Sequence, residues 1–139
     1  MSHREDQHYI IDLCDEVLGL TAAREHTFDF LRGDSRGDTK GRKLPVDAYY
    51  EDLMLVVEYH EKQHQPGDSV PLWDYKQTVS GVSRKVQRAI YDQRRRDVLP
   101  KHGIRLVELS IDRFAHRGRK LQRHRDADRE VIAQLLKGS

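Results

Sequence analysis

The chain has very little cysteine and no long hydrophobic run, and both absences restrict what it can be. Cys14 is its single cysteine, so an internal disulfide and a cysteine-rich zinc site are excluded. No stretch approaches the roughly 20 apolar residues that a membrane-spanning helix needs, and no apolar signal segment follows the N-terminus. We therefore expect a cytoplasmic protein with no membrane partner, in which Cys14 is a small buried residue of an apolar helical pattern.

Apolar residues are also scarce: 37% of the 139 residues are hydrophobic, whereas 35% are charged. A chain of this length still buries enough surface to form a real core. We expect residues 1–139 to form a single domain with a compact core and a heavily charged surface.

The small net charge of +2 conceals a strong segregation of charge along the chain. Residues 1–75 contain 8 lysines and arginines against 16 aspartates and glutamates, and residues 76–125 contain 15 against 4. Such a distribution suits a metal-dependent enzyme that acts on a polyanion, because carboxylates bind the cation and basic groups bind phosphates. The alternative is that these are two solvated faces of an ordinary domain.

Hydrophobic periodicity predicts an α/β fold with the element order α-β-β-β-α-β-α. The run L-M-L-V-V is continuous and β-branched, which is typical of a buried central strand. Residues 32–43 are rich in glycine and charge, which indicates a loop at a hairpin or beside a ligand, and residues 62–76 indicate a functional loop. The expected helices are residues 8–20, 80–99 and 118–137, and the expected strands are residues 27–31, 44–50, 53–60 and 104–111.

Residues 60–64 spell H-E-K-Q-H, which matches the H-E-x-x-H pattern of zinc peptidases. That pattern requires both histidines on one face of a helix. Here a strand-like run precedes His60, and Pro66 follows His64 closely enough to break a helix. A zinc peptidase is therefore the weaker of the possible interpretations.

A second candidate site begins at Glu58. In a strand, Glu58 and His60 project to the same side, and Asp47 from the preceding strand is expected to lie beside Glu58. Carboxylate oxygens at this position would suit Mg²⁺ or Mn²⁺. The alternative for the two acids is a buried salt bridge.

These residues carry a resemblance to a known family. P-V-D at residues 45–47 and E-Y-H at residues 58–60 are similar to the P-D…(D/E)-x-K signature of the restriction-endonuclease-like nucleases. The branch that includes the very-short-patch repair endonucleases is the most similar, over residues 8–111. Its similarity rests on motifs in the same order: V-D-A-Y-Y at 46–50, L-V-V-E at 55–58, His64, D-Q-R-R at 92–95 and G-I-R-L-V at 103–107.

The resemblance implies a restriction-endonuclease-like core, with a central mixed four-stranded sheet flanked by helices. It implies an endonuclease that hydrolyses phosphodiester bonds in DNA with Mg²⁺, or Mn²⁺ as the alternative ion. Asp47 and Glu58 would be the metal ligands, and His64 a supporting or proton-transfer residue. The first helix would add a carboxylate, for which Glu16 is the candidate and Asp12 the fallback.

Two departures from the family pattern affect this interpretation. His60 stands where the family has lysine, and Glu61 stands where close relatives have glycine. Histidine transfers protons near neutral pH, so catalysis can survive the first change. The alternative is a non-catalytic nucleic-acid-binding module on the same fold.

The helix expected at residues 80–99 carries a basic stripe opposite its apolar side, made of Arg84, Arg88, Tyr91 and Arg95. On an outer face this stripe would contact DNA phosphates, and the alternative is a solvated helix face. Further cations extend the positive field, at Arg113, Arg117, Arg119, Lys120, Arg123 and Arg125. With one candidate site per chain, cutting both DNA strands would most simply need a homodimer.

Overall fold

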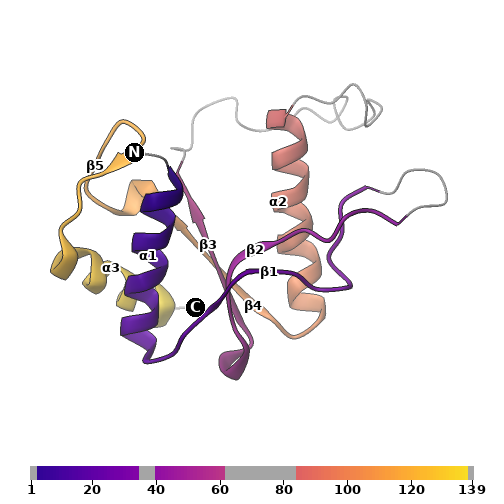
Figure 1. The fold of residues 1–139 in the computed structure, drawn as a ribbon, viewed down its shortest axis with the longest axis horizontal. Helices are drawn as coiled ribbons and strands as arrows, with labels where there is room; N and C mark the ends of the chain where they lie inside the picture. Colours follow the sequence, from indigo (N-terminus) through magenta and orange to yellow (C-terminus); the bar gives the residue numbers. More distant parts are fainter. Residues whose placement is uncertain (1–2, 35–39, 62–83, 138–139) are drawn as a thin grey trace. The chain divides into compact units, whose positions relative to one another are not determined.

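The computed structural model describes residues 3–34, 40–61 and 84–137, the side chains of residues 3, 4, 84 and 85 excepted (Figure 1). Its helices are α1 (His3–Leu18), α2 (Arg84–Lys101) and α3 (Arg125–Lys137), and single 3-10 turns lie at η1 (Glu51–Leu53) and η4 (Ile111–Arg113). Its strands are β1 (Ala23–His26), β2 (Val46–Tyr50), β3 (Leu55–His60), β4 (Arg105–Ser110), β5 (His116–Arg117) and β6 (Lys120–Leu121). No helix within these ranges is long and apolar enough to cross a bilayer.

Strands β1 to β4 form a mixed sheet in the order β1-β2-β3-β4. The first two pairings are antiparallel, and β3 pairs with β4 in parallel. The prediction of an α/β fold with a mixed four-stranded sheet is therefore confirmed. The predicted element order is also correct, with a short β5–β6 hairpin added between β4 and α3.

The chain divides into two compact units. One contains the described parts of residues 1–26, 46–64 and 104–139, which hold the sheet, α1, α3 and the β5–β6 hairpin. The other contains the described parts of residues 27–45 and 65–103, including α2. The single domain expected for residues 1–139 remains a prediction.

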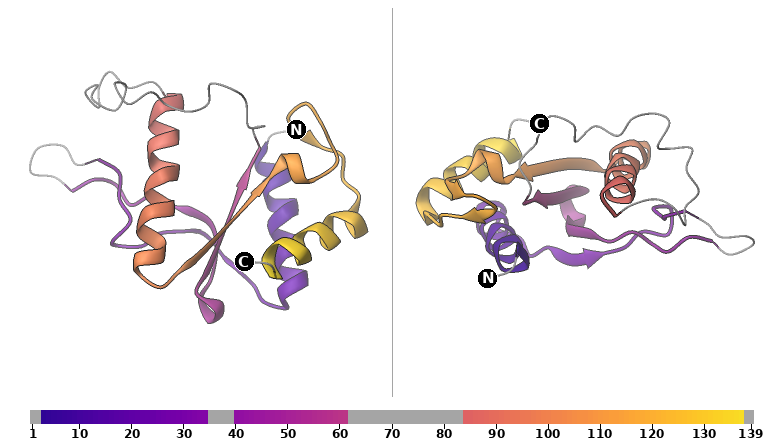
Figure 2. Two further views of the ribbon diagram at one scale, coloured as in Figure 1. Left: turned by 180° about the vertical axis from the view of Figure 1, so that it is seen from behind. Right: turned by 90° about the horizontal axis from the view of Figure 1, so that it is seen from above.

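In the first unit, α1 and α3 lie side by side against one face of the sheet (Figure 2). Alternate strand residues enter this core, among them Ala48, Val57 and Leu109. Cys14 of α1 is fully buried in the same core, as predicted, and burial raises the pKa of its thiol to about 12. Because strand residues alternate in direction, the neighbours of these core residues belong to the opposite face.

The first predicted strand was placed wrongly. The strand is β1 at Ala23–His26, and residues 27–31 form a turn in which the Leu31 amide donates to the Phe28 carbonyl at 3.2 Å. The alternation in F-D-F resembles a strand, but the Phe28 and Phe30 rings stack on each other at 5.0 Å. Phe30 also stacks on His102 at 3.6 Å, so the alternating aromatic residues pack in a turn rather than in the sheet.

The start of the last helix was also placed wrongly, since α3 begins at Arg125 and not near Gly118. Residues 116–121 form the β5–β6 hairpin instead. Gly118 has a φ of +62°, a conformation that glycine adopts without strain and that suits a two-residue hairpin turn. Leu121 is buried from this hairpin, so its apolar character did not indicate a helix.

In the second unit, the described ends of the predicted loop at residues 32–43 pair with each other. Arg32 pairs with Lys43, and the Gly33 amide donates to the Arg42 carbonyl at 2.8 Å. A Cβ atom at Gly33 would lie 2.8 Å from the Tyr91 hydroxyl oxygen, so a larger residue there would require the Tyr91 side chain to shift. The loop expected at residues 62–76 lies outside the described residues.

The helix expected at residues 80–99 is present as α2, described from Arg84. Pro100 and Gly103 were expected to close it. Pro100 lies inside the last turn, the helix ends at Lys101, and Gly103 follows with a φ of +72°.

Candidate active site

The register of the sheet aligns three acids on neighbouring strands, which we call the carboxylate row: Asp47, Glu58 and Glu108. Ala48 pairs with Val57 across β2 and β3, so the preceding Asp47 lies opposite the following Glu58. Glu58 is also the direct partner of Glu108 in the parallel β3–β4 ladder. Since Ala48 and Val57 point into the α1–α3 core, the row lies on the opposite face of the sheet.

Asp47 and Glu58 are tied to each other's strands by short hydrogen bonds. The Asp47 amide donates to Glu58 Oε2 at 2.6 Å, and the Tyr59 amide donates to Asp47 Oδ2 at 2.7 Å. Glu58 is only 6% exposed, so these charge-assisted bonds supply polar partners that a buried carboxylate needs. The expected proximity of Asp47 and Glu58 is confirmed, and each accepts from a backbone amide of the neighbouring strand.

His60 and Glu108 form a pair at the carboxyl ends of β3 and β4. His60 Nε2 lies 2.9 Å from Glu108 Oε1, and each side chain is 29% exposed. A carboxylate on one ring nitrogen selects the tautomer and orients the imidazole. The pair therefore places an oriented histidine at one end of the carboxylate row.

Glu108 was not predicted as a site residue. Two features could have indicated it: it interrupts the apolar run L-V-E-L, as Glu58 interrupts L-V-V-E-Y, and both runs were expected to be strands. The missing information was that β3 and β4 are parallel neighbours with Glu58 and Glu108 in register.

The oxygen donors of the row suit a hard divalent cation such as Mg²⁺. Asp47 and Glu58 are the residues that would hold it. Across residues 3–34, 40–61 and 84–137, however, no three His, Cys, Asp or Glu side chains are already arranged around a common metal position. A carboxylate has two oxygens with about four lone-pair sites, so Asp47 and Glu58 can accept their amide bonds and ligate an ion as well.

The helical arrangement of a zinc peptidase does not occur at His60, which is the last residue of strand β3. His64, the second histidine of that pattern and a predicted catalytic residue, lies outside the described residues.

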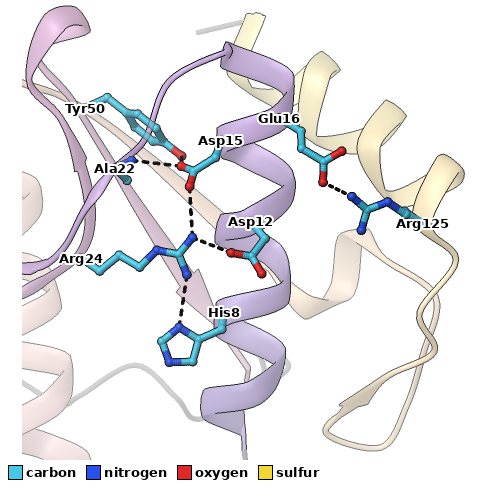
Figure 3. A network of polar contacts seen from close by, with 8 residues as sticks. All are labelled: His8, Asp12, Asp15, Glu16, Ala22, Arg24, Tyr50 and Arg125. Carbon is cyan, nitrogen blue, oxygen red and sulfur yellow. Dashed lines mark hydrogen bonds and ion pairs between the residues drawn. The ribbon is translucent and has the colours of Figure 1, made fainter.

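Glu16 and Asp12 were candidates for a third metal ligand, but the structure does not bring them to the row. Both lie on α1, which packs on the other face of the sheet. Glu16 pairs with Arg125 of α3 (Figure 3). It also lies 3.9 Å from Arg129. Asp12 accepts a 2.6 Å bond from Arg24. Glu16 therefore lies near α3, and Asp12 lies near β1.

Asp15 is the centre of a polar network that the sequence did not predict (Figure 3). It accepts bonds from the Tyr50 hydroxyl at 2.6 Å, the Ala22 amide at 3.1 Å and Arg24 at 3.1 Å. Burial and the bond to Asp15 raise the pKa of Tyr50. Arg24 also contacts His8 Nδ1 at 3.3 Å. This network fastens α1 to β1 and β2, which is a structural role.

The basic stripe of α2 is only partly exposed. Arg88 is exposed, whereas the Tyr91 hydroxyl accepts from the Asp34 amide at 3.3 Å. Arg95 donates to Asp92 at 3.0 Å and to the Pro45 carbonyl at 2.9 Å, and its side chain is 13% exposed. An outer-face position was thus wrong for Arg95 and Tyr91, because Pro45 and Asp34 of the same unit contact these two side chains. The side chain of Arg84 is not described.

Comparison of the chain with protein-family models, curated proteins and solved structures found no match.

Proposed function

We propose that this protein is a metal-dependent endonuclease that hydrolyses phosphodiester bonds in DNA, with Mg²⁺ as its ion and Mn²⁺ as the alternative. The observation that carries the proposal is the carboxylate row with His60 at its end. Acidic oxygen donors beside an oriented proton-transfer group are what metal-assisted attack of water on a phosphodiester requires. The restriction-endonuclease-like fold is part of the same proposal, supported by the element order and the motifs at Asp47 and Glu58.

Each residue has a role that follows from its position. Asp47 and Glu58 would hold the ion, which would supply positive charge to the phosphate and to the attacking water. His60 accepts the proton of that water. With its Nε2–H donated to Glu108, the basic nitrogen of the neutral ring is Nδ1. Glu108 is then a positioning residue. His64 remains the alternative proton acceptor.

Supercoiled plasmid conversion tests the proposal. Wild-type protein is incubated with plasmid in Mg²⁺, Mn²⁺, Zn²⁺ or EDTA, beside Asp47→Asn and Glu58→Gln. We expect nicking or linearisation with Mg²⁺ or Mn²⁺ only, reduced by about 100-fold or more in both variants. The form of the product also bears on oligomeric state. Linear plasmid would indicate that both strands are cut, as expected of a homodimer, and nicked plasmid would indicate that one strand is cut.

The matched control is Glu51→Gln, an exposed acid of η1 at the far end of β2 and β3. This variant should cleave like the wild type. Cleavage retained by an Asp47→Ala, Glu58→Ala double variant contradicts the proposal.

A second candidate is a non-catalytic nucleic-acid-binding module. Two observations favour it: histidine occupies the family's lysine position, and Asp47 and Glu58 each bond a backbone amide of the neighbouring strand. Both acids would then serve to hold β2 and β3 together. This candidate predicts salt-sensitive DNA binding that EDTA does not change, with no cleavage product.

A further inference from the structure

The β5–β6 hairpin is a small basic ribbon with a defined geometry. His116 pairs with Leu121 and Arg117 pairs with Lys120, and the Gln122 amide closes its base by donating to the Ala115 carbonyl at 2.8 Å. Gly118 occupies the first position of its two-residue turn. The hairpin therefore presents Arg117 and Lys120 side by side, with Arg119 at the tip.

The hairpin is anchored to the first unit by its inward side. Leu121 is 9% exposed, and its amide donates to Asp6 Oδ2 of α1 at 3.1 Å. Asp6 is itself buried and also accepts from Arg123 at 2.9 Å, just after the hairpin. Because residues alternate across a strand, burial of Leu121 directs Lys120 outward. The ribbon is thus a fixed element whose basic side is turned to solvent.

The cations of the hairpin differ from most neighbouring arginines. Within the described residues, the exposed side chains of Arg113, Arg117, Arg119 and Lys120 form no ion pair, whereas Arg123 and Arg125 pair with Asp6 and Glu16. Asp112 is the only acid between residues 109 and 125. Like charges directly opposite each other across a hairpin are destabilising. The repulsion between Arg117 and Lys120 therefore destabilises the hairpin, and a bound polyanion would remove this repulsion.

The hairpin lies at the same end of the sheet as the carboxylate row, on the α1 side, because Leu121 belongs to the core that α1 and α3 form. β4 ends at Ser110, which is in register with His60, and the chain reaches the hairpin directly after η4. Figures 1 and 2 show β5 near the end of the sheet at which β3 and β4 terminate.

We propose that the β5–β6 hairpin binds the phosphate backbone of duplex DNA through Arg117, Arg119 and Lys120. This inference rests on the proposed function, because the hairpin would hold the backbone at the end of the sheet where cleavage occurs. A two-stranded ribbon is an element that a DNA groove accommodates, and arginine and lysine are the main phosphate ligands. An anionic membrane is the less suitable partner, since the tip, Gly118-Arg119, has no apolar residue to insert.

Fluorescence anisotropy of a short labelled duplex, measured in EDTA so that no cleavage intervenes, tests the inference. The variant is Arg117→Gln, Arg119→Gln, Lys120→Gln, titrated between about 50 and 200 mM KCl. We expect affinity to fall about tenfold or more, and the slope of log affinity against log salt to become shallower by about 3. Arg117→Lys, Arg119→Lys keeps the charges and should keep the wild-type slope.

The matched control removes three exposed cations from the other unit, as Arg42→Gln, Lys43→Gln, Lys101→Gln, and should change the affinity by less than about threefold. Equal affinity and slope for wild type and the hairpin variant would overturn the inference. So would binding to phosphatidylserine vesicles but not to the duplex. Hairpin-dependent binding without plasmid cleavage would support the hairpin while contradicting the endonuclease.

Discussion

The two faces of the sheet use carboxylates in different ways. On the face covered by α1 and α3, Asp12 and Asp15 share the guanidinium of Arg24, and Glu16 pairs with Arg125. On the other face, Asp47 and Glu58 each accept from a backbone amide of the neighbouring strand, and Glu108 lies against the imidazole of His60. A guanidinium stays charged at all ordinary pH values and fixes its acids permanently, whereas an imidazole gains and loses a proton near neutral pH.

We expect the acids on the two faces to contribute to different properties of the protein, its stability and its catalysis. Removing Asp15 would leave the Tyr50 hydroxyl, in a side chain only 1% exposed, without its acceptor. Amide side chains at positions 47 and 58 still offer an oxygen to the same backbone N–H groups. The helix acids should therefore matter for folding, and the row acids for cleavage.

The largest expected effect is on the α1 face. Asp15→Ala should lower the free energy of unfolding by about 3 kcal/mol, because a buried hydroxyl and part of an arginine pair lose their acceptor. Urea denaturation followed by circular dichroism measures it. Glu16→Ala, which breaks a more exposed pair, should cost less than about 1 kcal/mol. If both variants lost the same free energy of unfolding, the buried network at Asp15 would be no more important for stability than the surface pair at Glu16.

The next effect concerns the pair at the end of the row. Glu108→Gln should lower plasmid cleavage by about tenfold, which is about 1.4 kcal/mol, because His60 loses the carboxylate that orients it. His60→Gln should cost at least as much. The double variant should be no slower than His60→Gln alone, since Glu108 acts through His60. Additive losses measured in this double-mutant cycle would mean that the two residues act separately.

A smaller effect is expected from pH, and it originates in the α1 core. Burial raises the pKa of Cys14 to about 12, whereas an unfolded thiol ionises near pH ~8.5. The stability that this group contributes is therefore complete below that pH and is lost as the pH rises toward 12. Between pH 9 and 10 the loss should be about 1 kcal/mol by urea denaturation. Cys14→Ala should have a shallower dependence on pH, and an unchanged slope would show that Cys14 does not contribute.

The smallest expected effect is that of substitutions in the carboxylate row on the free energy of unfolding. Asp47→Asn and Glu58→Gln should each change the free energy of unfolding by less than about 1 kcal/mol, because the amide oxygens can still accept from the two backbone amides. The measurement is the same urea denaturation used for Asp15. A loss of about 3 kcal/mol in either variant would make the two faces alike and would favour the non-catalytic candidate.

Much of the fold could be predicted because its elements have strong local patterns. The apolar runs that became β3 and β4, and the periodicity of α1 and α2, are properties of consecutive residues. The errors at residues 27–31 and 118–124 came from short segments, where alternating aromatic residues or one apolar leucine are compatible with more than one conformation. There the packing of Phe30 on His102, and of Leu121 into the core, decided the outcome.

By itself the sequence determined that Glu58 and His60 share one side of a strand, because alternation along an extended chain is a local property. It also determined that the basic residues gather after residue 76. Only the tertiary structure decided that Glu108 joins the row, because β3 and β4 are separated by α2 in sequence and their parallel register depends on long-range pairing. It also decided which charges are paired: Arg95 is covered within its own unit, while the cations of the β5–β6 hairpin remain exposed, since burial depends on contacts between segments distant in sequence.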